Sequence, residues 1–164
     1  MIICLAARGT RYASWRRAAV AAGLSAAVAL AIGQVLANAV DRSRPFVADP
    51  GGVHMFTHHA ADPGFPSDHA TAAFAIAVAI LLRKRGWGIF ALVVASIVSV
   101  GRVALGIHYP SDILAGMLLG TAVALVLYIP PIRARIDWLA DFAGAIWDRV
   151  LDWGAERLGL AWRA

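Results

Sequence analysis

The sequence contains a single cysteine, Cys4, so no disulfide can form within the chain and the redox compartment stays undetermined. We expect no secretory signal peptide, because the apolar stretch 2–7 is too short for one and ends at Arg8. Charge is absent from residues 18–40 and again from residues 113–132. Hydrophobic residues make up 60% of the chain, against roughly 45–50% in soluble domains. The composition therefore excludes an ordinary soluble domain and indicates a membrane protein.

The uncharged stretches have lengths typical of membrane-spanning helices. Each of the two long ones matches the ~20 residues that cross a bilayer core of ~30 Å. Two shorter runs, 70–82 and 86–101, are separated only by Arg83, Lys84 and Arg85, which indicates a helical hairpin across the same membrane. We predict an all-α integral membrane bundle of about four transmembrane helices, at 18–40, 68–83, 86–104 and 112–130. An irregular loop at 41–67 joins the first two, and the short turn GIHYPS joins the last two.

The basic residues lie mostly on one side of this predicted topology. Nine of them flank the ends that we place in the cytoplasm, and three fall on the other side: Arg42, Arg44 and Arg102. This asymmetry follows the positive-inside rule. The basic charges border spans rather than forming one face, so we expect no nucleic-acid partner.

The tail differs from the predicted spans. Apolar residues recur at steps of three and four from Ile136 to Trp153, and acidic residues follow another face from Asp137 to Glu156. That pattern predicts an amphipathic helix. We predict a membrane-embedded domain at 1–132 and a cytoplasmic interfacial helix at 133–164. The alternative is a helix packed on a protein partner, and the acidic face of the helix disfavours strong binding to anionic lipid.

Polar and ionisable residues from separate segments meet at the face opposite the basic clusters. They are Arg44, Ser67, Asp68, His69, Arg102, His108 and Asp112. Ionisable groups at membrane depth are costly and usually functional. Taken singly, Ser67 or Asp68 could simply cap a helix, and His69 could be a structural histidine. Their convergence favours a functional site.

These residue types suit phosphate transfer. Two arginines can bind phosphate oxygens, and the free N–H groups at a helix start add donors. Two histidines can divide nucleophilic and acid–base roles. Asp112 follows His108 by four residues, so its carboxylate can fix the tautomer of that ring. The predicted site is therefore a phosphoryl-transfer site with a histidine nucleophile.

The motifs resemble a known family. Residues 37–45 (ANAVDRSRP), 66–69 (PSDH) and 101–112 (GRVALGIHYPSD) are similar to the three-part signature of the type 2 phosphatidic acid phosphatase and haloperoxidase superfamily. The segments 44–46, 65–71 and 106–116 look most like its bacterial undecaprenyl-diphosphatase branch, the bacitracin-resistance type. The resemblance covers about residues 18–130 and implies a helical core that needs no metal or other cofactor.

The resemblance also implies residue roles. His108 would attack phosphorus, Asp112 would orient it, and His69 would protonate the leaving oxygen and then activate water. The phosphoryl oxygens would be held by Arg44, Arg102, Ser67 and backbone N–H groups near Asp68. Three positions depart from the signature: Ala37 replaces Lys, Asp68 replaces Gly and Gly101 replaces Ser. Arg42 could take the place of the missing lysine.

The predicted function is hydrolysis of undecaprenyl or decaprenyl diphosphate to the monophosphate, at the extracytoplasmic side of the plasma membrane. Alternatives are a phosphatidate or phosphatidylglycerophosphate phosphatase and an inactive scaffold or transporter derived from the family. The spans argue against a soluble haloperoxidase. Family members usually carry one or two further helices before the first motif. His54, His58 and His59 indicate a solvated loop or a head-group contact rather than zinc, and the oligomeric state stays open.

Overall fold

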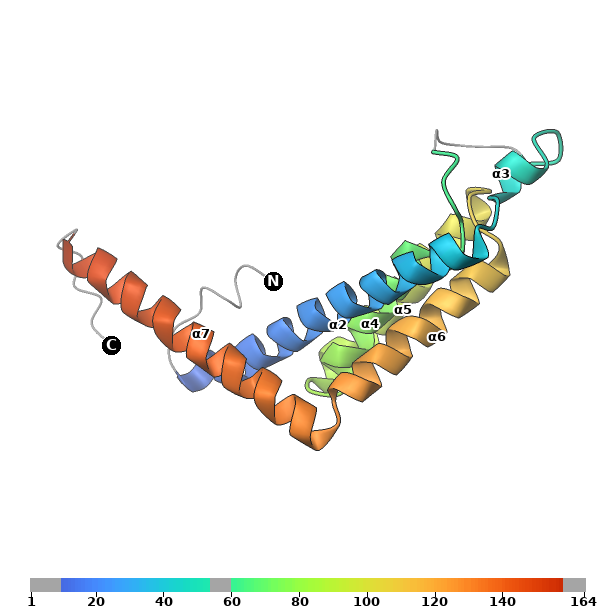
Figure 1. Cartoon of the computed structure of the whole chain (residues 1–164). Helices are drawn as coiled ribbons and strands as arrows, with labels where there is room; N and C mark the ends of the chain where they lie inside the picture. Colours follow the sequence, from blue (N-terminus) through green and yellow to red (C-terminus); the bar gives the residue numbers. More distant parts are fainter. Residues whose placement is uncertain (1–9, 54–59, 158–164) are drawn as a thin grey trace.

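The computed structural model describes residues 10–53 and 60–157 of the chain. Helices make up nearly all of the regular structure in these residues (Figure 1). In chain order they are α2 (Thr10–Val40), α3 (Pro45–Ala48), α4 (Asp68–Leu81), α5 (Arg85–Ala104), α6 (Pro110–Leu127) and α7 (Pro130–Arg157). The all-α class predicted from the sequence is confirmed.

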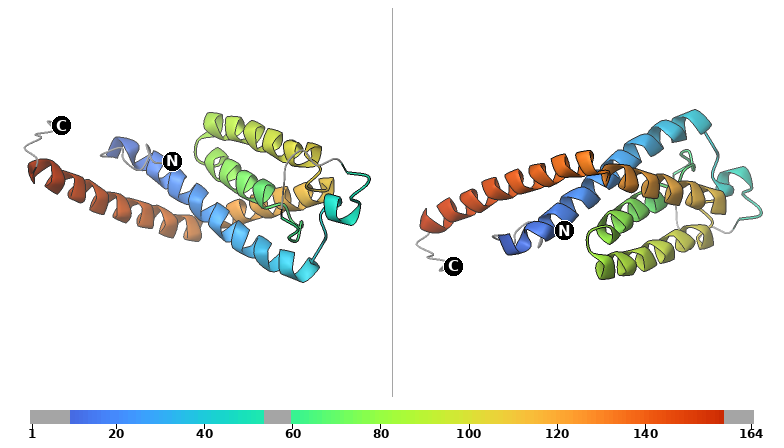
Figure 2. Two further views of the ribbon diagram at one scale, coloured as in Figure 1. Left: turned by 90° about the horizontal axis from the view of Figure 1, so that it is seen from above. Right: turned by 90° about the horizontal axis from the view of Figure 1, so that it is seen from below.

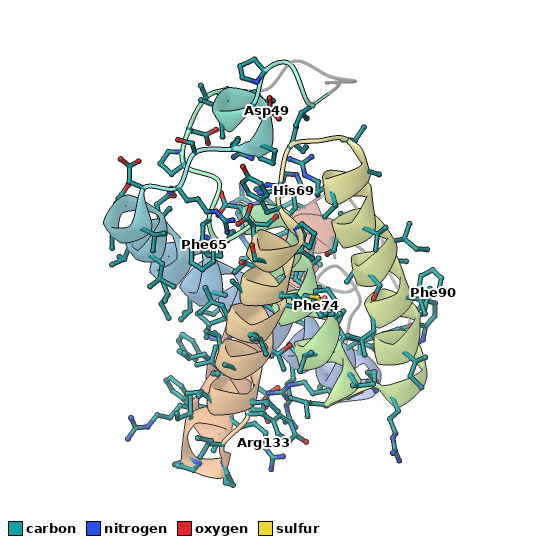
Figure 3. The ribbon with its side chains drawn as sticks, turned by 90° about the vertical axis from the view of Figure 1, so that its right-hand side faces the viewer. Asp49, Phe65, His69, Phe74, Phe90 and Arg133 are labelled. Atoms are coloured by element: carbon teal, nitrogen blue, oxygen red, sulfur yellow. The ribbon has the colours of Figure 1, made fainter. Side chains whose placement is uncertain are left out.

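Helix α4 forms the centre of the bundle and packs against α2, α5 and α6 (Figures 1 and 2). Its sequence explains this position, because its buried residues are mostly small: Ala70, Thr71, Ala75, Ala77 and Ala79. Small side chains let neighbouring backbones approach closely, which favours helix association where lipid removes the hydrophobic drive. The larger buried side chain of Phe74 fills the middle of the bundle (Figure 3).

Two glycines of α6 permit its closest approach to α4. A Cβ added at Gly120 would lie 2.3 Å from the carbonyl oxygen of Thr71, and one at Gly116 would lie 2.7 Å from that of Ser67. Both obstacles are backbone atoms, which cannot move without shifting a helix. The four-residue spacing of the glycines matches the small-xxx-small pattern of membrane helix pairs. This contact fixes the start of α4 against the start of α6.

Within residues 10–53 and 60–157, three segments are long and apolar enough to cross a membrane: Tyr12–Ala48, Arg85–Ala104 and Pro110–Leu127. The fourth predicted span is the apolar helix α4, which has 14 residues. Hydrophobic side chains cover the outside of α5, where Phe90 points away from the bundle (Figure 3). The chain is therefore a multi-pass membrane protein by length and composition of its helices, and a count of four spans stays a prediction.

Helix α7 leaves the bundle and crosses the N-terminal half of α2 (Figures 1 and 2). Aspartates of α7 pair with arginines of the bundle: Asp148 lies 3.0 Å from Arg16, and Asp137 lies 2.7 Å from Arg83. This part of the acidic face therefore packs on the same chain, whereas the tail pattern predicted an interfacial helix or a helix packed on a partner. Helix α7 begins at Pro130, three residues before the predicted boundary.

Candidate active site

Four segments of the chain meet at the end of the bundle opposite α7. They are the loop after α2, the loop before α4, the end of α5 and the start of α6. Figure 3 shows His69 at this end, near the segment that carries Asp49, and Arg133 at the other. A backbone hydrogen bond of 3.1 Å from Ser67 N to Asp112 O ties the second motif to the third. The sequence motifs are therefore brought together, as the convergence of polar residues predicted.

His108 is buried, and both of its ring nitrogens have partners. Nδ1 lies 2.9 Å from the carbonyl oxygen of Gly64, and Nε2 lies 3.1 Å from Nη1 of Arg44. A carbonyl oxygen only accepts and a guanidinium only donates. The proton must therefore be on Nδ1, and the lone pair of Nε2 points toward Arg44. This neutral tautomer is the one that a nucleophilic imidazole requires.

Asp112 is fully buried at the third position of α6, but its hydrogen bonds do not go to His108. Oδ2 accepts from the backbone N–H of Tyr109 at 2.8 Å, and Oδ1 accepts from Arg42 at 3.0 Å. Oδ2 lies 3.6 Å from Nδ1 of His108. The sequence predicted a carboxylate that fixes the tautomer directly. In the structure the Gly64 carbonyl holds Nδ1, because the loop before α4 comes closer to the ring, and Asp112 supplies negative charge beside it.

Arg42 binds a carboxylate of the protein, whereas the sequence suggested that it takes the place of the missing lysine. Its Nη1 donates to Ser111 Oγ at 2.7 Å and to Asp112, and its guanidinium lies 4.3 Å from the centre of the Tyr109 ring. These contacts direct the cation toward a buried carboxylate.

Arg44 is buried and aimed at the nucleophile by two further residues. Its Nε donates to the carbonyl and the carboxylate oxygen of Asp62, at 3.1 and 3.0 Å. Gly64 leaves the space for its stem, since a Cβ there would lie 3.0 Å from Cγ of Arg44. Sequence reasoning missed Asp62 and Gly64. The only signal for them was their position directly before the PSDH motif.

Ser67 occupies the N-cap position of α4, yet its side chain makes no capping hydrogen bond. It is fully buried, and its Oγ has no hydrogen-bond partner in the part of the chain that the structure describes. A buried hydroxyl without a partner is unfavourable unless a ligand satisfies it. This observation weighs against simple helix capping and supports a role for Ser67 as a donor to a bound anion.

The remaining predicted residues lie around this core. Asp68 and His69 are exposed in the first turn of α4, at the positive end of its helix dipole. Arg102 lies in the last turn of α5, near enough to Arg44 for the two positive charges to repel each other. An anion between the arginines would relieve that repulsion.

A search of residues 10–53 and 60–157 finds no group of three His, Cys, Asp or Glu side chains arranged to hold a metal ion. The three loop histidines considered at the sequence level, His54, His58 and His59, lie outside the described residues.

A comparison with known protein families identifies the family to which the chain belongs. The sequence profile of the PAP2 superfamily matches residues 18–134. The chain belongs to the PAP2 superfamily. This confirms the resemblance noted from the three motifs and covers every predicted site residue.

Relatives of this PAP2 chain are named for lipid phosphate hydrolysis. YbjG of Escherichia coli strain K12, provisionally named as an undecaprenyl-diphosphatase, is 34% identical over 84% of this chain and 65% of its own length. The undecaprenyl-diphosphatase BcrC of Bacillus subtilis strain 168 is 34% identical over 65% of this chain and 54% of its own. A decaprenylphosphoryl-5-phosphoribose phosphatase of Mycobacterium tuberculosis is 34% identical over 68% of this chain and 60% of its own.

This PAP2 chain spans roughly half to two thirds of the length of those curated relatives. No solved structure gives a significant match.

Proposed function

We propose that the chain is a lipid phosphatase that hydrolyses a polyprenyl diphosphate to the monophosphate through a phosphohistidine at His108. The observation that carries this proposal is the pair of contacts that His108 makes: Nδ1 lies 2.9 Å from the Gly64 carbonyl oxygen, and Nε2 lies 3.1 Å from Nη1 of Arg44. These contacts leave the lone pair of Nε2 facing the guanidinium of Arg44. A lone pair held against a cation is where the phosphorus of an anionic substrate would arrive.

Binding begins with an exchange of hydrogen bonds. A phosphoryl oxygen replaces Nε2 as the acceptor for Nη1 of Arg44, which frees the lone pair for attack. The hydroxyl of Ser67 donates a second hydrogen bond, and Arg102 neutralises further negative charge. The N-terminus of α4 adds its N–H groups. All of these donors stabilise charge that develops on the phosphoryl group in the transition state.

In the first step, Nε2 of His108 forms a bond to the terminal phosphorus, and the bond from phosphorus to the bridging oxygen breaks. The bonding electrons stay on that oxygen, which takes a proton from His69 and leaves as the polyprenyl monophosphate. The ring keeps its proton on Nδ1, held by the Gly64 carbonyl. The carboxylate of Asp112, 3.6 Å from Nδ1, stabilises the positive charge that the ring gains.

In the second step, His69 removes a proton from a water molecule as its oxygen attacks the phosphorus. The bond from phosphorus to Nε2 breaks, its electrons return to the ring, and inorganic phosphate leaves. His69 is then protonated for the next cycle. The exposure of His69 suits this exchange, because both the leaving group and water must reach it.

An apolar cavity of about 970 Å³ between α2 and α5 supports a lipid substrate. Ala73 and Val98 line it. Ala73 follows His69 by four residues on α4, and Val98 precedes Arg102 by four on α5, so each lies one turn from a site residue on the same helix face. A chain attached to a phosphate at the site can therefore continue along this cavity.

Phosphate release from three different lipid phosphates tests the proposal. Purified protein in detergent is offered undecaprenyl diphosphate, phosphatidate and phosphatidylglycerophosphate, with excess EDTA, and phosphate release is measured. We expect the diphosphate to give the highest kcat/KM and EDTA to leave it unchanged. A preference for phosphatidate would replace the assigned substrate. Activity that EDTA abolishes and one divalent ion restores would overturn the mechanism.

Gly23→Leu tests the lipid cavity. Gly23 lines the cavity and has nothing within 4 Å of an added Cβ, so leucine fills space without a backbone clash. We expect KM to rise for the long polyprenyl substrate and to stay constant for farnesyl diphosphate. Ala122→Leu, exposed on α6 and not part of the cavity lining, is the matched control. Equal KM values for the two variants would remove the cavity from the proposal.

A further inference from the structure

We propose that α7 lies in the lipid–water interface at the end of the bundle opposite the candidate site, with its aromatic side against the bilayer. In this proposal the lipid surface, rather than a protein, covers the exposed aromatic side of α7. The proposal is independent of the reaction that the site performs.

Three of the aspartates of α7 are paired with cations of the bundle. Arg17 forms two hydrogen bonds to Asp141 through Nε, at 2.9 and 3.2 Å, and that bonding holds the pKa of the Asp141 carboxyl below its ordinary value. Asp148 accepts from the buried Arg16, and Asp137 from Arg83. Three carboxylates that would repel an anionic lipid surface are therefore neutralised by cations of the bundle.

The ion pairs also determine which side of α7 faces outward. Ile136, Ala140 and Gly144 are buried and recur every four residues, so they form one stripe against the bundle. The aspartates flank that stripe. The opposite side of the helix carries large exposed apolar residues: Trp138, Leu139, Phe142, Ile146, Val150 and Trp153. Water would solvate this side poorly, and tryptophan and phenylalanine favour the membrane interface.

Chain connectivity places α7 at the membrane surface. Helix α6, a candidate span, ends at Leu127, and α7 begins at Pro130. Tyr128 lies between them, with the guanidinium of Arg133 4.9 Å from its ring centre. A tyrosine and an arginine at the end of a span are typical anchors at the head-group level. The start of α7 therefore lies at the head-group level, at the end of a candidate span.

A cation on the outward side matches anionic lipid. Arg135 is exposed, and helix geometry places it among the exposed aromatic residues, whereas Arg149 donates to the carbonyl of Ala145, nearer the aspartates. Long basic side chains can extend to lipid phosphates while their stems cover apolar surface. Three aspartates of α7 therefore face the protein, and its aromatic residues face the lipid.

Spin labels on adjacent positions test the orientation. Single cysteines replace Ile146, on the aromatic side, and Ala145, exposed about a quarter turn away toward the aspartates, in a background with Cys4 replaced by Ser. The full chain is placed in vesicles of phosphatidylethanolamine and phosphatidylglycerol. We expect the label at 146 to collide more with oxygen than with a water-soluble nickel complex, and the label at 145 to show the reverse.

Three outcomes would overturn the proposal. Preference for the nickel complex at both positions would put α7 in water. Protection of position 146 from both reagents would indicate a covering protein, and spin–spin broadening at 146 that disappears on dilution with unlabelled chain would identify that protein as a second copy.

A charge reversal tests the role of the ion pairs. Asp141→Lys sets two cations against each other, so we expect the label at 145 to become more mobile and its neighbour at 146 to lose its preference for oxygen. Combining Asp141→Lys with Arg17→Asp should restore both readings. Unchanged collision preferences in the single variant would overturn the part assigned to the ion pairs.

Discussion

At the scale of single residues, Gly64 has two roles that no other residue type can combine. Its carbonyl accepts from His108, and its missing side chain leaves room for Arg44, whose Cγ would lie 3.0 Å from a Cβ. We predict that Gly64→Ala displaces Arg44 and lowers kcat/KM about tenfold or more, since a hydrogen bond to a charged group is worth about 1.5–3 kcal/mol.

Phosphate release by purified protein measures this effect. Gly101→Ala is the matched control, because it lies near the site on α5 and has nothing within 4 Å of an added Cβ. It should keep the parental rate. Equal rates for the two variants would contradict the role given to Gly64.

Arg42 belongs with Asp112 in a charge pair. Because Asp112 is fully buried, losing its cation leaves a carboxylate poorly compensated. We predict that Arg42→Ala lowers kcat about 10- to 100-fold by this loss of a charged hydrogen bond, with less effect on KM, whereas Arg42→Lys keeps part of the rate. Steady-state kinetics of the two variants separate the outcomes.

If Arg42 instead contacts the substrate directly, in place of the lysine that Ala37 replaces, the expected effects on kcat and KM are reversed. In that case Arg42→Ala would raise KM and leave kcat near the parental value. Ala37 is itself buried on α2, one turn after Gly33, where an added Cβ would lie 3.9 Å from Oδ1 of Asp68.

The sequence predicted which side chains meet at the site but not how they are held. His108, Asp112, Arg44 and Ser67 lie together, because motif spacing and helix ends are visible in the residue order. The Gly64 carbonyl as partner of Nδ1 could not be foreseen, since backbone acceptors carry no sequence signature. The contact depends on how one irregular loop folds over another.

At the scale of helices, the contact between α4 and α6 positions the two halves of the site. Gly120→Ala would bring a Cβ within 2.3 Å of the Thr71 carbonyl, so the helices must separate. We predict a loss of about 1–3 kcal/mol of stability, seen as a lower Tm in detergent, together with reduced activity.

The control for that variant is Gly23→Ala on α2, where an added Cβ meets nothing within 4 Å. It should be neutral or stabilise by up to ~1 kcal/mol, because alanine favours the helix over glycine. A Tm for Gly120→Ala at or above that of Gly23→Ala would refute the close packing of α4 on α6.

The positions of the helices were predictable because charged residues separate the apolar stretches of the chain. The ranges 86–104 and 112–130 lie within a few residues of α5 and α6, which are bounded by basic residues and prolines. The short helix α3 was not predicted, since four residues carry no periodicity. The direction of the acidic face of α7 was left open, because only the fold brings Arg16, Arg17 and Arg83 beside it.

At the scale of the whole molecule, the two ends of the bundle differ in charge and chemistry. The basic residues near the start of α2, between α4 and α5 and near the start of α7 lie at one end, and the candidate site lies at the other. We predict that the site end is extracytoplasmic. A cysteine replacing the exposed Asp49 should react with an impermeant reagent outside intact cells, and one replacing the exposed Arg85 should not. Labelling at 85 with protection at 49 would invert the topology.

The central claim is that His108 carries the phosphoryl group, and rapid quenching tests it most directly. Undecaprenyl diphosphate labelled with ³²P in its terminal phosphate is mixed with the parent, with His108→Ala and with His69→Gln, and protein-bound label is followed in time. We predict acid-labile, base-stable label on the parent and none in His108→Ala. In His69→Gln, which lacks the acid of the first step and the base of the second, we expect the label both to form and to decay more slowly than on the parent. Equal labelling of His108→Ala and the parent, or turnover by the parent without any protein-bound label, would contradict the account.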